Sequence, residues 1–136
     1  LNKDIVEQYG KNLKIVYKNL LYFFSRRKKM SLKKSFSKDK TTCTVTFTVS
    51  AEAAQGAKTV NIAGDFNSWS STDTPLKQGK DGSFSVKIPL EVGKEYQFRY
   101  LLDGYKWEND WEADKYIPAP YSNADNSVVV TSKKVD

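Results

Sequence analysis

Three tryptophans, an arginine and an asparagine stand where they could form a binding surface. Trp69 follows a turn signal, Trp107 and Trp111 lie in a segment rich in Glu, Asp and Asn, and none belongs to an alternating strand pattern. An exposed indole is a flat apolar platform with one N–H group, and it usually serves binding. Arg99 alternates away from its aromatic neighbours and Asn126 opens the last strand, so both can donate hydrogen bonds. Flat rings with donors at their edge suit a pyranose, which has an apolar C–H face and a rim of hydroxyls.

The same residues also have purely structural interpretations. A tryptophan in a loop can cover a sheet edge, and Asn67 and Asn126 can cap turns through side-chain hydrogen bonds. Residues 108–114 contain four carboxylates, but glycoside hydrolysis needs a pair held about 5–10 Å apart in a deep cleft. A domain this small has little volume for such a cleft, so we predict no catalytic residues.

The content of cysteine and histidine argues against several other classes of site. Cys43 is the only cysteine and there is no histidine, so neither an internal disulfide nor a zinc site of Cys and His can form. The chain also lacks a glycine-rich phosphate loop and a nucleophile elbow. We therefore predict a non-enzymatic protein without cofactor or metal. The single thiol fits a reducing compartment, and we predict a cytoplasmic location.

The positive net charge is confined to the N-terminal third of the chain. Residues 1–40 hold 12 Lys and Arg against 3 Asp and Glu, a net charge of +9, whereas residues 41–136 hold 10 against 13, a net charge of −3. A nucleic-acid-binding domain needs positive charge on its own binding face. We therefore expect no nucleic-acid partner. No run of eighteen apolar residues exists, so no membrane span is expected either.

Apolar residues recur at every second position in the middle of the chain. They alternate with polar residues over 43–49, 84–90 and 96–102, and Gly-containing turn signals such as Asp81-Gly82 and Asp103-Gly104 separate the runs. Several short strands of this kind indicate an antiparallel β-sandwich over about residues 41–131. Its predicted core, in which Cys43 is a small member, comprises Val45, Phe47, Val60, Ile62, Phe84, Val86, Ile88, Tyr96, Phe98 and Tyr100.

Residues 1–29 have a different periodicity. Apolar residues at a 3-4 spacing from Val6 to Phe23 predict an amphipathic helix over residues 3–25, and residues 30–40, rich in Ser and Lys, read as a solvated linker to the sandwich at 41–136. The helix could pack on the sandwich or on a second copy of the chain, which would allow self-association. It could instead lie on an anionic membrane surface. Because Met30 resembles a start of translation, residues 1–29 could also be a non-native extension.

Five short segments in a fixed order carry a resemblance to a known family. They are Val60–Trp69, which contains Gly-Asp-Phe-Asn-Ser-Trp; Thr74-Pro75-Leu76 followed by Gly82-Ser83-Phe84; Tyr96–Gly104; Trp107 with Asp110; and Asn126–Val130. Together they resemble the glycogen- and starch-binding modules of the β subunit of AMP-activated protein kinase and of isoamylase N-terminal early-set domains. The segments resemble those of small stand-alone members from Bacteroidetes more closely still.

The resemblance implies an all-β fold, an immunoglobulin-like antiparallel sandwich here preceded by the N-terminal helix. It also implies a non-catalytic module that binds α-glucans such as glycogen, starch and maltooligosaccharides. The family positions that contact sugar correspond to Trp69, Arg99, Trp107 and Asn126, with Trp111 as a further candidate. The family usually follows its second tryptophan with Asp-Pro, whereas Asp110 is followed here by Trp111, so the second aromatic contact could be Trp107, Trp111 or both. The alternative is a structural or protein-interaction module of the same fold whose sugar site has decayed.

Overall fold

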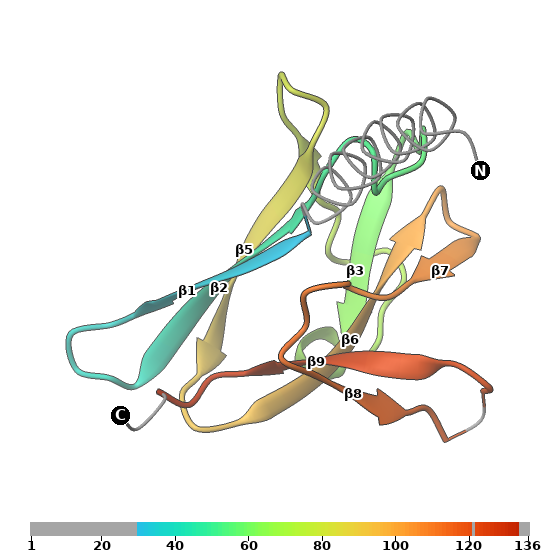
Figure 1. Ribbon diagram of the computed structural model, residues 1–136. Coiled ribbons are helices and arrows are strands. Elements are labelled where there is room, and N and C mark those ends of the chain that lie inside the picture. The colour runs from blue at the N-terminus through green and yellow to red at the C-terminus, as the bar shows by residue number, and fades with distance from the viewer. Residues whose placement is uncertain (1–29, 121, 134–136) are drawn as a thin grey trace, which may run out of the picture.

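The predicted all-β fold is confirmed by two antiparallel sheets that form a sandwich (Figure 1). The computed structural model describes residues 30–120 and 122–133. A four-stranded sheet has the order β1-β2-β5-β4, and its strands are β1 (Ser31–Phe36), β2 (Thr42–Val49), β5 (Phe84–Glu91) and β4 (Lys77–Gln78). A five-stranded sheet has the order β3-β6-β9-β8, and its strands are β3 (Val60–Gly64), β6 (Glu95–Leu102), β9 (Asp125–Val130) and β8 (Lys115–Pro118), with β7 (Lys106–Glu108) also paired to β6. A short 3-10 helix, η1 (Asp65–Asn67), follows β3.

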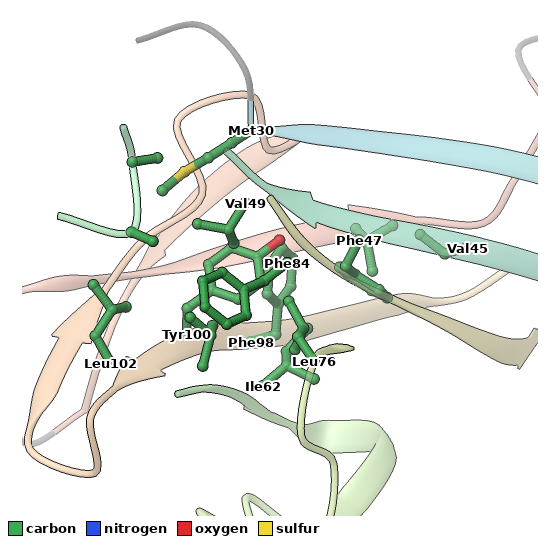
Figure 2. Packing of buried hydrophobic residues seen from close by; sticks show 14 of the residues in the cluster. Met30, Val45, Phe47, Val49, Ile62, Leu76, Phe84, Phe98, Tyr100 and Leu102 are labelled. Atoms are coloured by element: carbon green, nitrogen blue, oxygen red, sulfur yellow. The ribbon is translucent and has the colours of Figure 1, made fainter. Parts of the chain in front are cut away.

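Alternation along the strands builds the core between the sheets. In β2 every second residue from Cys43 to Val49 is buried and the residues between them are partly exposed. Phe47 from this sheet meets Phe98 of β6 edge to face, with ring centroids 5.1 Å apart. Figure 2 shows these side chains pointing into one space from both sheets. The predicted core is confirmed, since seven of its ten members are buried and the other three, Val86, Ile88 and Tyr96, pack against them.

The interpretation of residues 30–40 as a solvated linker is wrong. Residues 31–36 form strand β1, which pairs antiparallel with β2 along its full length, from Ser31 opposite Thr48 to Phe36 opposite Cys43. Met30 is only 1% exposed and belongs to the core, against which Leu32 and Phe36 also pack. The lysines between them hid this alternation. β1 satisfies backbone groups that would otherwise form an unpaired edge on β2.

Two further findings concern the parts of the sequence that carried no strand prediction. β7 overlaps the Glu-, Asp- and Asn-rich segment that contains Trp107 and Trp111, and β8 follows that segment; both are short strands with exposed residues. The helix expected over residues 3–25, with its interpretations as a packing, membrane-surface or self-association element, lies outside the described residues. Within residues 30–120 and 122–133 no helix is long and apolar enough to cross a membrane.

Burial of Met30 leads to a test of β1 as part of the sandwich. We expect Met30→Ala to lower the free energy of unfolding by about 2–5 kcal/mol, because it leaves a cavity in a close-packed core. Denaturant unfolding measures this change. Lys33→Ala, at an exposed position of β1, is the control and should shift stability by no more than about 0.5 kcal/mol. Equal, small effects of both variants would show that β1 is not docked.

Candidate functional site

A groove of about 570 Å³ lies on the face of the five-stranded sheet that points away from the core. Its described lining residues are Asp65, Trp69, Gln97, Arg99, Trp107, Ala119, Pro120, Ser122 and Asn126. The pleat of β6 explains this position. Phe98 and Tyr100 belong to the core and Tyr96 packs against it, so Gln97 and Arg99 between them face the other side of the sheet. Ala119, Pro120 and Ser122 of the β8–β9 connection supply one wall of the groove.

The structure brings together four of the five predicted site residues. Trp107 lies on β7 opposite Leu101, and Asn126 on β9 comes directly before Ser127, the partner of Phe98. Arg99 and Trp69 complete the set. Trp69 is 36% exposed and Trp107 is 44% exposed, so both indoles present a surface to solvent.

Trp111 does not line the groove, although it is 39% exposed. Its backbone N–H lies 3.3 Å from the sulfur of Met30, beside β1. A second hollow there is lined by Met30, Ser31, Leu32 and Glu112. Trp111, which follows Asp110, therefore lies on the β1 side of the molecule.

Asp65 and Gln97 are groove residues that sequence reasoning missed. Gln97 could have been found, because it alternates with Phe98 in the same pattern that identified Arg99. Asp65 gave no such signal, since an aspartate in a Gly-Asp-Phe-Asn segment reads as an ordinary turn residue. Its place in the groove depends on how the turn folds back over β6.

The turn that carries Trp69 is strained and firmly held. Ser68 and Trp69 both have left-handed backbone conformations, with φ of 55° and 57°. A bulky residue in that region is uncommon and costs about 1–3 kcal/mol, a strain that concentrates at functional sites. Asn67 holds the turn, because its Oδ1 accepts a bond from Gly64 N at 2.9 Å and its Nδ2 donates to Ile62 O at 2.9 Å and to Thr74 Oγ1 at 3.0 Å.

Gly64 is required where this turn meets β6. A Cβ atom at that position would lie 2.5 Å from the carbonyl oxygen of Gln97 and 2.8 Å from Cβ of Phe98. Neither contact can be relieved by moving the end of a flexible side chain. The turn that carries Trp69, residues 64–69, is called the platform turn below. The absence of a side chain at Gly64 thus lets this turn lie directly against the strand that carries Gln97 and Arg99.

Arg99 has hydrogen-bonding capacity that the described protein does not use. Its Nε and Nη2 atoms are buried, and neither has a hydrogen-bond partner among the described residues. A buried donor that makes no hydrogen bond lowers the free energy of unfolding, and the loss is larger when the donor is charged. Because both atoms are covered by protein, a ligand in the groove does not reach them in this conformation.

A buried carboxyl group anchors the loop that follows Trp107. Asp110 is fully buried; its Oδ2 accepts a bond from the Tyr100 hydroxyl at 2.7 Å and its Oδ1 one from Glu112 N at 2.8 Å. Its own N–H donates to Ser127 Oγ at 2.9 Å. Burial raises the pKa of Asp110, although the Tyr100 bond opposes that shift. Burial, and then the charge of Asp110, raises the pKa of Tyr100 well above its usual value, so the phenol remains the donor.

The carboxylates of residues 108–114 do not face the groove. Glu108 accepts a bond from Gln55 at 3.1 Å, Asp110 is buried, Glu112 lines the other hollow, and Asp114 pairs with Lys34 at 2.6 Å. Asp65 is the one carboxylate among the described lining residues. Those residues therefore lack the acid pair that glycoside hydrolysis needs. In the described part of the chain no group of three or more His, Cys, Asp or Glu side chains could hold a metal ion.

The groove lies within a region that matches one protein family. The family model for the glycogen recognition site of AMP-activated protein kinase matches residues 47–136. The match runs from the end of β2 through β9 and includes every described groove residue. No curated protein matches the chain.

The hydrogen bonds of Asn67 give a test of the platform turn. We expect Asn67→Ala to lower the free energy of unfolding by about 2–3 kcal/mol, because it leaves a part-buried N–H and a C=O without partners. Denaturant unfolding measures the change. Asn123→Ala, at an exposed position in the β8–β9 connection, is the matched control and should change stability by less than about 0.5 kcal/mol. A similarly small loss for Asn67→Ala would mean that the turn does not depend on this side chain.

The raised pKa of Asp110 gives a prediction for the pH dependence of stability. The folded protein holds the Asp110 proton more tightly than the unfolded chain does, so stability from this group falls as pH rises from the ordinary value of 3.8 through the raised folded value. We expect the stability of the wild type relative to Asp110→Asn to decrease over that window. Urea unfolding of both proteins at pH 4, 5, 6 and 7 measures it. The opposite slope would show that the ionised carboxylate is stabilised by its partners.

Proposed function

Because this chain belongs to the family of the glycogen recognition site of AMP-activated protein kinase, we propose that it binds α-glucans in the groove and does not cleave them. Carbohydrate binding in general follows from the family. The finer proposal is that glycogen, starch or maltooligosaccharide occupies the groove. Trp69 and Trp107 stack on glucose rings, and Arg99 and Asn126 donate hydrogen bonds to hydroxyls. Trp111 lies outside the groove, and we propose no contact from it.

The observation that carries the proposal is the combination of two exposed indoles and an arginine in the lining of one groove. Indole faces suit the C–H face of a pyranose, and the guanidinium offers several N–H groups to its hydroxyl rim. A stacked ring removes roughly 60 Å² of apolar surface from water, which is worth about 1.5 kcal/mol at about 25 cal/mol per Å². That energy corresponds to about tenfold in affinity.

Two such platforms, set against the cost of ordering ligand and side chains, support only moderate affinity. We expect a Kd for maltoheptaose between about 10 µM and about 1 mM. Titration of the sugar while tryptophan fluorescence is followed measures it, and retardation in gels that contain glycogen tests the polymer. No response at several millimolar sugar would favour the alternative, a structural or protein-interaction module of the same fold.

Two tryptophan variants test whether the groove is the site. We expect Trp69→Ala to weaken maltoheptaose binding about tenfold or more, whereas Trp111→Ala should stay within about twofold of the wild type. Circular dichroism confirms that each variant is folded, and calorimetry measures each Kd. Equal losses from both variants would place the sugar elsewhere. Incubation of wild type with maltoheptaose should release no shorter oligosaccharide, and release would show that the protein is an enzyme.

A further inference from the structure

We propose that Asp65 is a positioning residue that fixes the Trp69 platform before the ligand arrives. The inference rests on the proposed function, because the platform matters only if the groove binds sugar. Asp65 acts through the Trp69 indole and the backbone of β6, and the sugar itself is not its partner. Three hydrogen bonds across three elements support this assignment.

The first two bonds use both oxygens of the Asp65 carboxylate. The Trp69 Nε1–H donates to Oδ1 at 3.0 Å, and the Gln97 N–H donates to Oδ2 at 2.7 Å. Bonds with an ionised acceptor are stronger than those between neutral groups. The carboxylate therefore ties the indole to β6, the strand that also carries Arg99.

The third bond extends this connection to β9. The side-chain Oε1 of Gln97 accepts a bond from Asn126 Nδ2 at 3.0 Å. Asn126 thus uses one of its two amide hydrogens within the protein. Trp69, Asp65, Gln97 and Asn126 form one chain of hydrogen bonds along the groove.

Trp69 needs such a restraint because its surroundings do not supply enough. The indole is more than one third exposed, and its backbone occupies the left-handed region. Without the Nε1 bond the ring would sample other rotamers, and sugar binding would have to order it. Ordering a side chain at the moment of binding lowers affinity, whereas restraint in the free protein avoids that loss.

The free protein allows a test that does not depend on sugar. In a Trp107→Phe, Trp111→Phe background, Trp69 is the only fluorophore of its kind. We expect Asp65→Ala to increase acrylamide quenching of Trp69 and to lower its fluorescence anisotropy, with Asp65→Asn intermediate because it keeps one acceptor. Asp73→Ala removes an exposed carboxylate from the same turn region and should change neither signal. Unchanged quenching in Asp65→Ala would overturn the proposal.

A double-mutant cycle separates positioning from direct sugar contact. Trp69→Phe keeps a flat ring but lacks the N–H donor, so Asp65 can no longer act through that bond. We expect Asp65→Ala to raise the Kd for maltoheptaose about three- to tenfold when residue 69 is Trp, and less than twofold when it is Phe. Calorimetry measures all four affinities. The same loss in both backgrounds would mean that Asp65 contacts the sugar, and the positioning role would be wrong.

Failure of the positioning role of Asp65 can be distinguished from failure of the proposed function. If the wild type binds no maltoheptaose while Asp65→Ala still frees Trp69 in the quenching experiment, the proposed function fails and the restraint itself stands. If Asp65→Ala does not fold, Trp69→Phe breaks the same bond from its other end and keeps the bond to Gln97. That variant should then bind maltoheptaose at least threefold more weakly than wild type, and an unchanged affinity would overturn the proposal.

Discussion

The pleat of β6 is the constraint on which both the core and the groove depend. Successive side chains of a strand point to opposite faces of a sheet, so Phe98 and Tyr100 enter the core while Gln97 and Arg99 face the groove. β3 pairs with one edge of β6, and β7 and β9 share the other. A shift of the β6 register by one residue would bury Arg99 and expose Phe98. Burial of the apolar side chains therefore fixes the register of β6 and, with it, which polar side chains face the groove.

A buried polar network connects the core to the loop that carries the second tryptophan. The Tyr100 hydroxyl, at the inner face of β6, binds the Asp110 carboxylate, and Asp110 in turn holds Ser127 and Glu112 through backbone N–H groups. Ionised Asp110 is disfavoured by burial, so this arrangement costs stability at neutral pH. In return, the chain after Trp107 is fixed to the two strands that carry Arg99 and Asn126. The cost lies in the core, whereas the benefit lies in the geometry of the groove.

The platform turn likewise adopts a geometry that lowers the stability of the protein. Two successive left-handed residues, Ser68 and Trp69, are strained, and Asn67 and Gly64 make the strain tolerable by satisfying the backbone and by removing a steric clash with β6. Such local strain is maintained only when the surrounding contacts determine it. Trp69 is thereby held partly exposed in the lining of the groove, as a platform for a flat ligand requires.

Local pattern in the sequence determined much of this protein, and tertiary contacts decided the rest. Period-two alternation identified β2, β5 and β6 and their core residues, and the Gly-Asp-Phe-Asn-Ser-Trp turn pointed to Trp69. Alternation failed for β1, because Lys33 and Lys34 hide the apolar residues whose burial depends on pairing with β2. It could not choose between Trp107 and Trp111. These residues are only four positions apart, but Trp107 lines the groove and Trp111 lies beside Met30. It also could not show that Asp65 reaches Gln97, 32 residues away. Alternation is a property of neighbours in the chain, whereas a groove is made by residues that only the folded sheets bring together.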